Sequence, residues 1–309
     1  MNGYTEKAIK SICRHKIDDL CKYISKDDKE LAEDLRKHCF VSGGAITSLL
    51  QGEQPNDFDI YIDNLDVLYK ICVYYTNQWN NNHKRKKSFT ILKHNDEYNN
   101  RIEIQVTSSG IVNDNDVDTQ DEDYNIDEQD DNIDDIIDDK IKYRVRCITS
   151  NAISLSDDIQ IICRFCGNPE QIFKNYDFIH TMQAYTRMDD NLILNTNSLV
   201  SIMCKRLQYQ GSLFPICSLF RMRKFIKRGW TISSMEIFKI AYQISKLDLG
   251  NIDVLREQLI GCDYFYMMSF CKELNEWQLK NKEEEISYEY MFELIEKVFD
   301  KDYTIKDEK

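Results

Sequence analysis

Apolar residues recur three or four positions apart in two stretches near the amino terminus, which predicts two amphipathic helices. Their apolar positions are Ala8, Ile9, Ile12, Ile17 and Leu20, then Leu31 and Leu35. A third helix is expected over 65–79. Strands are expected where apolar and polar residues alternate, at 89–92, 102–106, 143–148 and 159–165 and around Phe58 and Ile60. Together these segments predict a mixed sheet packed against helices.

From Pro169 onward the apolar spacing is helical almost throughout. The helices expected there cover 198–207, 215–228, 234–247, 254–260 and 288–299. A chain of 309 residues is long enough to bury two cores. We therefore expect an α+β architecture, with a mixed-sheet domain over 1–168 and an all-helical domain over 169–309. The boundary is expected near Gly167 to Asp177.

Two aspartates stand one residue apart on the expected strand around Phe58. Asp57 and Asp59 alternate with Phe58 and Ile60, and because a strand sends alternate side chains to one face, both carboxylates are expected to point the same way. Carboxylate oxygens suit Mg²⁺, and a pair of such ions stabilises the attacking and leaving oxygens in phosphoryl or nucleotidyl transfer. Because a D-x-D pattern also occurs often by chance, the pair needs support from its surroundings.

That support comes from a double glycine upstream of the aspartates. Gly43 and Gly44 follow an apolar strand and open a short helix. Without Cβ atoms they let the backbone approach a triphosphate, and the helix that follows directs its free N–H groups at that anion. Ser42 is expected to add a hydroxyl donor.

The order of strand, double glycine, short helix, polar loop and D-F-D resembles the signature of the nucleotidyltransferase superfamily that includes DNA polymerase β. In detail, FVSGGAITSLLQGEQPNDFDIYID is similar to the GGAxRD-type motif of CCA-adding enzymes and poly(A) polymerases. The resemblance implies a nucleotidyltransferase palm in which Asp57 and Asp59 are the catalytic residues and bind two Mg²⁺ or Mn²⁺ ions. It also implies nucleotide binding by Ser42, Gly43 and Gly44.

The chain departs from this motif in the helix after the glycines. The family usually has Arg-Asp there, whereas this chain has Ile46, Thr47 and Ser48. The departure leaves the metal chemistry intact and removes residues that the family uses to discriminate sugar and base.

Two further segments resemble the same family, in the same order along the chain. YDFIHTMQAY, at 176–185, is similar to the family's RDFTINAMAY stretch and implies nucleotide binding by Asp177, with Asn175 and Tyr176 in place of arginines. LFRMRKFIKRGWTIS, at 219–233, is similar to the neck-helix sequence RILRAVRFAAxLGFTI. There Arg221 and Lys224 occupy arginine positions, which implies that they hold the incoming triphosphate.

A third metal-binding carboxylate, which the family usually supplies from a later strand, has two alternative counterparts. Gln160 occupies the corresponding position in IQIICRF, and a neutral amide cannot supply the same charge to a metal ion. Glu103 in RIEIQV lies on an alternating strand that we expect near the D-F-D strand, where a structural pairing role is at least as good an explanation. A chain without a third carboxylate would be a slow enzyme or a binding relic.

The net charge of −13 is concentrated in one segment. Between Asp114 and Asp139 there are fourteen acidic residues and no Lys or Arg, and removing fourteen negative charges from −13 leaves +1 on the rest of the chain. So acidic a block cannot bury enough apolar surface to offset its ordering entropy. We expect a disordered insert over about 113–139, best explained as a tolerated solvated insertion.

Two basic clusters remain as expected contacts for a nucleic-acid backbone. They are HKRKK at 83–87, which is equally well explained as a solvated turn, and the stretch from Arg221 to Arg228. Near the second cluster, we expect Trp230, Tyr209 and Phe225 to offer stacking faces.

Cysteine usage and hydropathy indicate a cytoplasmic protein. The eleven cysteines have no disulfide-framework spacing, which favours reduced thiols. The single CxxC at Cys163 and Cys166 has no partner pair with zinc-like spacing, so a zinc site is not expected there. No run approaches the roughly 20 apolar residues of a membrane span, and no signal peptide is recognisable, so no membrane partner is expected.

Taken with the resemblance, these features predict a template-independent nucleotidyltransferase that adds nucleotides, AMP or CMP and AMP, to an RNA 3′ end. The resemblance implies a nucleoside triphosphate substrate, ATP foremost, and an RNA partner, tRNA or other. The chain also looks like compact members encoded by large DNA viruses and phages. Two alternatives stay open: transfer to a protein or small-molecule hydroxyl, and an RNA-binding relative whose active site has decayed.

Overall fold

The computed structural model describes residues 3–82, 87–96, 99–107 and 142–259, and in the carboxy-terminal part 270, 273–274, 276–277 and 286–299. The acidic insert expected at about 113–139 lies outside these residues, as does 83–86 of the HKRKK cluster. Two units can be distinguished, Met1–Cys204 and Lys205–Lys309, and each is described by itself.

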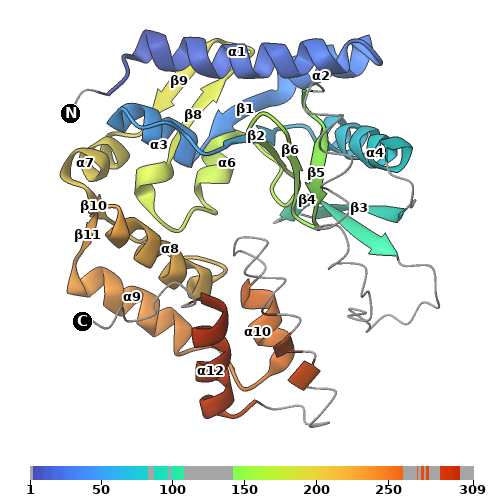
Figure 1. The fold of residues 1–309 in the computed structure, drawn as a ribbon. Coiled ribbons are helices and arrows are strands. Elements are labelled where there is room, and N and C mark those ends of the chain that lie inside the picture. Colours follow the sequence, from blue (N-terminus) through green and yellow to red (C-terminus); the bar gives the residue numbers. More distant parts are fainter. Residues whose placement is uncertain are drawn as a thin grey trace, which may run out of the picture. The chain divides into compact units, whose positions relative to one another are not determined.

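The first unit is built on a mixed seven-stranded sheet in the order β5-β6-β7-β2-β1-β8-β9 (Figure 1). Neighbouring strands are antiparallel except β2 and β7, which are parallel. The strands are β1 (Cys39–Ser42), β2 (Phe58–Ile62), β5 (Val145–Ile148), β6 (Ala152–Leu155), β7 (Ile159–Ile162), β8 (Gln183–Thr186) and β9 (Asn191–Leu194). The α+β class and the mixed sheet expected from the sequence are confirmed.

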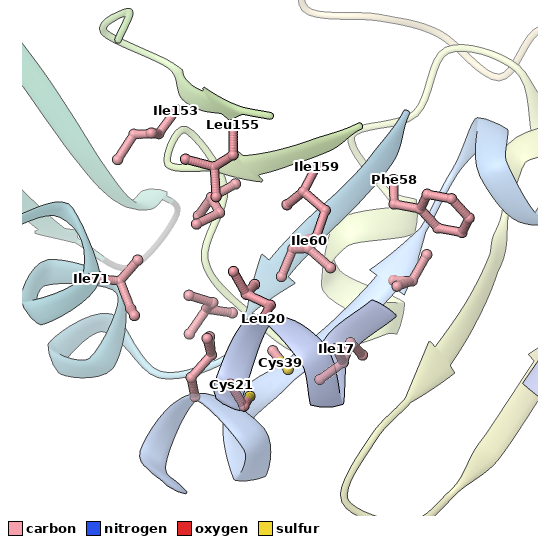
Figure 2. Packing of buried hydrophobic residues seen from close by; sticks show 14 of the residues in the cluster. Ile17, Leu20, Cys21, Cys39, Phe58, Ile60, Ile71, Ile153, Leu155 and Ile159 are labelled. Atoms are coloured by element: carbon pink, nitrogen blue, oxygen red, sulfur yellow. The ribbon is translucent and has the colours of Figure 1, made fainter. Parts of the chain in front are cut away.

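One face of this sheet carries the main hydrophobic core. Figure 2 shows Ile17 and Leu20 of α1 (Glu6–Ile24) in the same cluster as Ile60 of β2 and Ile71 of α4 (Leu65–Asn82). Helix α2 (Lys29–His38) adds Leu31 and Leu35 to the same cluster. The helices predicted from apolar spacing in this part of the chain are therefore confirmed.

The opposite face of the sheet is covered in part by a smaller cluster. Phe40 of β1 stacks on Tyr61 of β2, with ring centroids 5.6 Å apart. Ile172 and Phe173 of the short helix α6 (Pro169–Phe173) pack against this pair together with Ala184. The side chains of β1 and β2 thus alternate between two different packing environments.

The strands expected at 89–92 and 102–106 form a separate hairpin rather than part of the main sheet. It consists of β3 (Ser88–Asp96) and β4 (Asn99–Thr107). The Ile102 N–H donates to the Cys163 carbonyl and the Cys166 N–H donates to the Asn100 carbonyl, each at 2.9 Å. The hairpin is therefore hydrogen-bonded to the segment that follows β7.

Two strands, β8 and β9, occur where helical spacing was expected after Pro169. β8 pairs with β1 and β9 pairs with β8, which places both in the main sheet. The helical prediction is wrong for these segments, because strands of four residues are too short for periodicity to separate them from helix. The 3₁₀-helix η2 (Ile179–Thr181) and α7 (Thr196–Cys204) also belong to the first unit, which ends later than the boundary expected near Gly167 to Asp177.

The second unit is mainly helical. Among its described residues, its helices include α8 (Pro215–Lys227), α9 (Ser234–Ile244), α10 (Ile252–Leu259) and α12 (Tyr288–Phe299). They correspond to four of the helices predicted from the sequence, and they share a core that includes Ile216, Leu255 and Leu294. In the described part of this unit, a two-residue parallel pair, β10 (Arg206–Leu207) with β11 (Thr231–Ile232), departs from the expected all-helical content. None of the helices in the described parts of the chain is long and apolar enough to cross a membrane.

Candidate functional site

A row of polar side chains crosses the centre of the seven-stranded sheet. Ser42 of β1 lies opposite Asp59 of β2, Asp59 lies opposite Gln160 of β7, and Gln160 lies opposite Ser154 of β6. Residues paired in register point to the same face of a sheet. All four side chains therefore share the face that also carries Phe40 and Tyr61, away from the main core.

The double glycine follows Ser42 directly. Gly43 has φ of +88° and ψ of −139°, a conformation that favours glycine, and α3 (Gly44–Gln51) begins after it. A Cβ on Gly43 would lie 3.5 Å from Oδ2 of Asp59, whereas a Cβ on Gly44 would meet nothing within 4 Å. The backbone of the turn therefore runs close to the Asp59 carboxylate.

The N-terminus of α3 is suited to an anion. Gly43 provides no side-chain cap for this helix, and the first N–H groups of a helix have no partners within it. Those N–H groups and the helix dipole favour negative charge at this end. An anion bound to these N–H groups would lie close to the Asp59 carboxylate.

Ser42 is fully buried and its hydroxyl is hydrogen-bonded. Its Oγ donates to the carbonyl oxygen of Gln183 at 2.7 Å and accepts from the Tyr176 hydroxyl at 2.8 Å. The same Gln183 carbonyl accepts from the Gly43 N–H at 3.4 Å. In this structure Ser42 thus helps to hold the glycine turn, and direct nucleotide binding by its hydroxyl stays a prediction.

Tyr176 lies over the turn. A Cβ on Gly43 would be 3.4 Å from its hydroxyl oxygen, and its ring contacts Tyr61 edge-on and Phe173 at a tilt. Burial raises the pKa of Tyr176 far above its usual range, and the Asp59 charge adds to the rise. The hydroxyl therefore stays protonated and remains a donor to Ser42 at every physiological pH.

The two predicted catalytic aspartates differ in exposure. Asp57 is exposed and precedes β2, whereas Asp59 is half-buried within β2. Among the residues that the structure describes, no group of three or more His, Cys, Asp or Glu side chains is placed to hold a metal ion. The oxygen donors of Asp57 and Asp59 fit Mg²⁺ or Mn²⁺ in kind, and Mg²⁺ commonly uses one or two carboxylates together with substrate phosphates.

The sheet register places one of the two candidates for the third ligand beside Asp59. Gln160 is the residue of β7 that lies beside Asp59, and its amide nitrogen is 3.5 Å from Oγ of Ser154. Glu103 lies on the β3–β4 hairpin, where His94, Arg101 and Gln105 lie within 3.0 to 3.3 Å of its carboxylate. These partners give Glu103 a structural role in the hairpin.

Asp177 is buried next to Tyr176. Its Oδ1 accepts from the N–H of Phe178 at 3.0 Å, at the entry to η2. Asp177 thus lies between α6 and η2 and directly follows Tyr176 in the sequence. Nucleotide binding by Asp177 stays a prediction.

Arg221 and Lys224 belong to the second unit, on α8, and are exposed. Their role in triphosphate binding stays a prediction. Of the expected stacking faces nearby, Trp230 and Tyr209 are buried, at 3% and 4% exposed, so neither can stack on a base. Phe225 is half-buried and its ring contacts Trp230.

The sequence does not identify two residues that complete the site. The sequence pattern presents Tyr176 only as a replacement for an arginine, and Gln183 acts through its backbone carbonyl, which no sequence pattern identifies. The side chain of Gln183 is also fully buried: it donates to the His180 carbonyl and contacts Thr47 of α3 and Ser198 of α7. Gln183 thereby links β8 to the helices around the glycine turn.

The fold and site define an α+β protein in which the Asp59 carboxylate lies beside a glycine turn that opens a helix, with Asp57 two residues before it. The sequence profile described as "Gad2: Gabija anti-defense 2 family protein" matches residues 11–205, which include all of these elements. The chain belongs to the Gabija anti-defense 2 family.

A curated relative is "Gabija anti-defense 2" of Bacillus phage SPbetaL7. It is 23% identical over 240 residues, which cover 75% of this chain and 44% of the relative. The chain thus spans less than half the length of the curated relative that it matches.

Solved structures with some similarity include CCA-adding enzymes. One is the Thermotoga maritima CCA-adding enzyme complexed with tRNA, with a TM-score of 0.39, 12% identity, and coverage of 90% of this chain and 55% of the enzyme. Another is a CCA-adding enzyme in complex with ATP, with a TM-score of 0.39, 13% identity, and coverage of 85% and 51%. TM-scores below 0.5 are too low to assign an activity, so the function must be argued from the site itself.

Proposed function

We propose that this protein is a nucleotidyltransferase that transfers a nucleotide from a nucleoside triphosphate, ATP foremost, to a hydroxyl acceptor. The observation that carries the proposal is the position of Asp59. Its carboxylate lies beside the glycine turn at the N-terminus of α3, where a Cβ on Gly43 would be 3.5 Å from Oδ2 of Asp59. This arrangement supports an anionic phosphate and a carboxylate-bound cation at the same point.

Each part of the site would have a distinct role. Asp57 and Asp59 would hold divalent cations, which when bound supply Lewis-acid stabilisation of charge on the phosphoryl oxygens. Gly43 and Gly44 would admit the triphosphate to the N–H groups of α3. Arg221 and Lys224 would bind the outer phosphates of the triphosphate. This role is proposed only from the resemblance of the α8 sequence to the family's neck helix.

The transfer itself exchanges a phosphoanhydride bond of the triphosphate for a phosphate ester bond to the acceptor. The acceptor hydroxyl oxygen forms a bond to the α-phosphorus while the bond to the bridging oxygen of the β-phosphate breaks. Pyrophosphate leaves with that electron pair, and the hydroxyl proton passes to water. Such a reaction depends mainly on positioning and on electrostatic stabilisation, which rigid elements such as β2 and α3 can provide.

The acceptor that we propose first is an RNA 3′ end, modified without a template, as the resemblance implies. A second candidate is a protein hydroxyl. It is favoured by membership of a family named for action against a defence system, and by Ile46, Thr47 and Ser48 in place of the usual Arg-Asp. Gln160 beside Asp59 supports the third alternative, a binding protein with a decayed site.

Incorporation of label from each α-labelled nucleoside triphosphate, with Mg²⁺ or Mn²⁺, tests these proposals. Total RNA and total protein are offered as acceptors, and the pool that becomes labelled identifies the acceptor. Asp57→Asn/Asp59→Asn should abolish labelling. The matched control is Asp66→Asn, because Asp66 is an exposed carboxylate at the start of α4 that pairs with Lys93.

Labelling of RNA by wild type and Asp66→Asn only would support the first proposal. Labelling that persists in the double variant would contradict it. Triphosphate binding without transfer to either pool would favour the non-catalytic alternative.

The biological role that we propose follows the relative's name: the chain counteracts Gabija. Expression in bacteria that carry Gabija should restore phage replication. If the chain counteracts Gabija through nucleotidyltransferase activity, the Asp59→Asn variant should fail to restore phage replication. Equal rescue by this variant would separate the biological role from the enzymatic proposal.

A further inference from the structure

Positive charge is concentrated at the start of the second unit. Residues 205–247 contain nine Lys or Arg and one acidic residue, Glu236, in a chain whose net charge is −13. Glu236 is buried, accepts from the Tyr209 N–H at 2.9 Å and pairs with Lys239 at 3.1 Å. The exposed charges of this segment are therefore all positive.

Helix α8 supplies the densest part of that charge. It contains no Asp or Glu. Its residues Arg221, Lys224 and Lys227 are exposed, and so is Arg228, which follows directly after the helix. Helix α9 packs against α8 and adds Lys239, with Lys246 just beyond its end. The two helices together present a surface suited to a polyanion.

Helix α9 also exposes aromatic rings on its outer surface. Phe238 and Tyr242 are 69% and 55% exposed, and their rings lie nearly parallel, at 11°, with centroids 6.3 Å apart. The Lys246 ammonium lies 4.2 Å from the centre of the Tyr242 ring. Exposed rings beside ammonium groups are the combination on which unpaired bases stack while their phosphates are neutralised.

Helix α12 shows that exposed aromatics alone do not make such a surface. Tyr288 and Phe292 also stand four residues apart and are 69% and 62% exposed. The exposed residues around them include Glu289 and Glu293. Negative charge at α12 would repel a phosphate backbone, so the same aromatic spacing is combined with opposite electrostatics in the two helices.

From this contrast we infer that the outer surface of α9, with the cations of α8, binds single-stranded RNA. Bases stack on Phe238 and Tyr242, and phosphates contact the neighbouring Lys and Arg side chains. A duplex keeps its bases stacked internally and cannot use the rings, so single strands are preferred. The inference rests on the proposed function, in which an RNA 3′ end is the acceptor. It assigns a surface that binds the acceptor RNA.

Fluorescence anisotropy of a labelled 12-nucleotide single-stranded RNA measures this binding directly, without nucleotide transfer. Phe238→Ala/Tyr242→Ala should weaken binding about tenfold or more, because stacking of each base contributes substantially to affinity. The matched control, Tyr288→Ala/Phe292→Ala, should change it less than twofold. Lys227→Gln/Lys246→Gln should reduce the slope of log Kd against log salt concentration.

The inference would be overturned by an absence of RNA binding by wild type, by equal loss in the α9 and α12 variants, or by equal affinity for single-stranded RNA and an RNA duplex. Circular dichroism of each variant shows whether lost binding reflects lost folding. If the α9 variant transfers nucleotides to RNA as well as wild type, the RNA-binding surface is contradicted and the proposed function is not. If wild type binds RNA but transfers nothing, the proposed function is contradicted and the RNA-binding surface is not.

Discussion

The two faces of the seven-stranded sheet use the same strands for different purposes. In β1, β2 and β7 the residues Val41, Ile60 and Ile161 enter the main core, and each is fully buried. Their neighbours Ser42, Asp59 and Gln160 form the polar row on the other face. The difference shows how one short strand serves two purposes: alternate residues pack in the core and stabilise the fold, and the residues between them form the proposed catalytic site.

The site face is not uniformly polar. Phe40 and Tyr61, two residues along from Ser42 and Asp59, stack on each other and pack against α6. The polar row therefore begins where this aromatic cluster ends. Packing of Phe40 and Tyr61 beside this row helps to fix the strands that carry it, as a preorganised site requires.

The largest effect expected from the comparison is the loss of activity in Asp59→Asn. Replacing the charged ligand should lower nucleotide transfer by about a thousandfold or more, equivalent to about 4 kcal/mol. The free energy of unfolding should change little, because Asp59 is half-buried and outside the main core. Transfer kinetics and urea unfolding measure the two quantities. A large loss of stability would show that the two faces are not separable.

The neighbouring substitution Ile60→Ala should have the opposite profile. Removing a fully buried side chain from the core should lower the free energy of unfolding by about 2–5 kcal/mol. The control Ile60→Val removes one methylene and should cost about 0.5–1.5 kcal/mol. At a temperature where the variant stays folded, its transfer rate should be close to that of wild type. A rate that falls as far as in Asp59→Asn would break the comparison.

A smaller, mixed effect is expected for Gly43→Ala. The left-handed φ should cost about 1–3 kcal/mol in stability, and the new methyl group would crowd Asp59 and the Tyr176 hydroxyl. Triphosphate affinity should fall in an equilibrium binding assay. The control Gly229→Ala separates the causes, because Gly229 also has a left-handed φ, +81°, but no neighbour within 4 Å of an added Cβ. Equal loss of affinity in Gly229→Ala would assign the effect to general destabilisation.

The smallest effect is expected for Gln160→Glu, which places a third carboxylate beside Asp59. Without divalent cations the added like charge should lower the melting temperature by a few degrees. Addition of Mg²⁺ should raise the melting temperature more than in wild type, because the ion neutralises the carboxylates. Thermal unfolding with and without Mg²⁺ checks this. Equal Mg²⁺ shifts in both proteins would contradict a metal site at Asp59.

The helices and the alternation of β2 could be predicted from the sequence because they depend on neighbours within a few residues. The spacing of Ile9, Ile17 and Leu20 is sufficient to define the buried side of α1. The hairpin location of Glu103 and the strand nature of β8 could not be predicted in this way. Both depend on pairing between segments far apart in the chain, and a four-residue strand carries little periodic signal.

The sequence by itself determined the chemical inventory of the site: a glycine pair at the start of a helix, and Asp57 and Asp59 on either side of Phe58. Only the tertiary structure decided which groups surround them. Parallel pairing of β2 with β7 brings Gln160 beside Asp59, and antiparallel pairing of β8 with β1 brings the Gln183 carbonyl to Ser42 and Gly43. The physical reason is that such contacts are set by the register of hydrogen-bonded strands and by core packing, which no local pattern specifies.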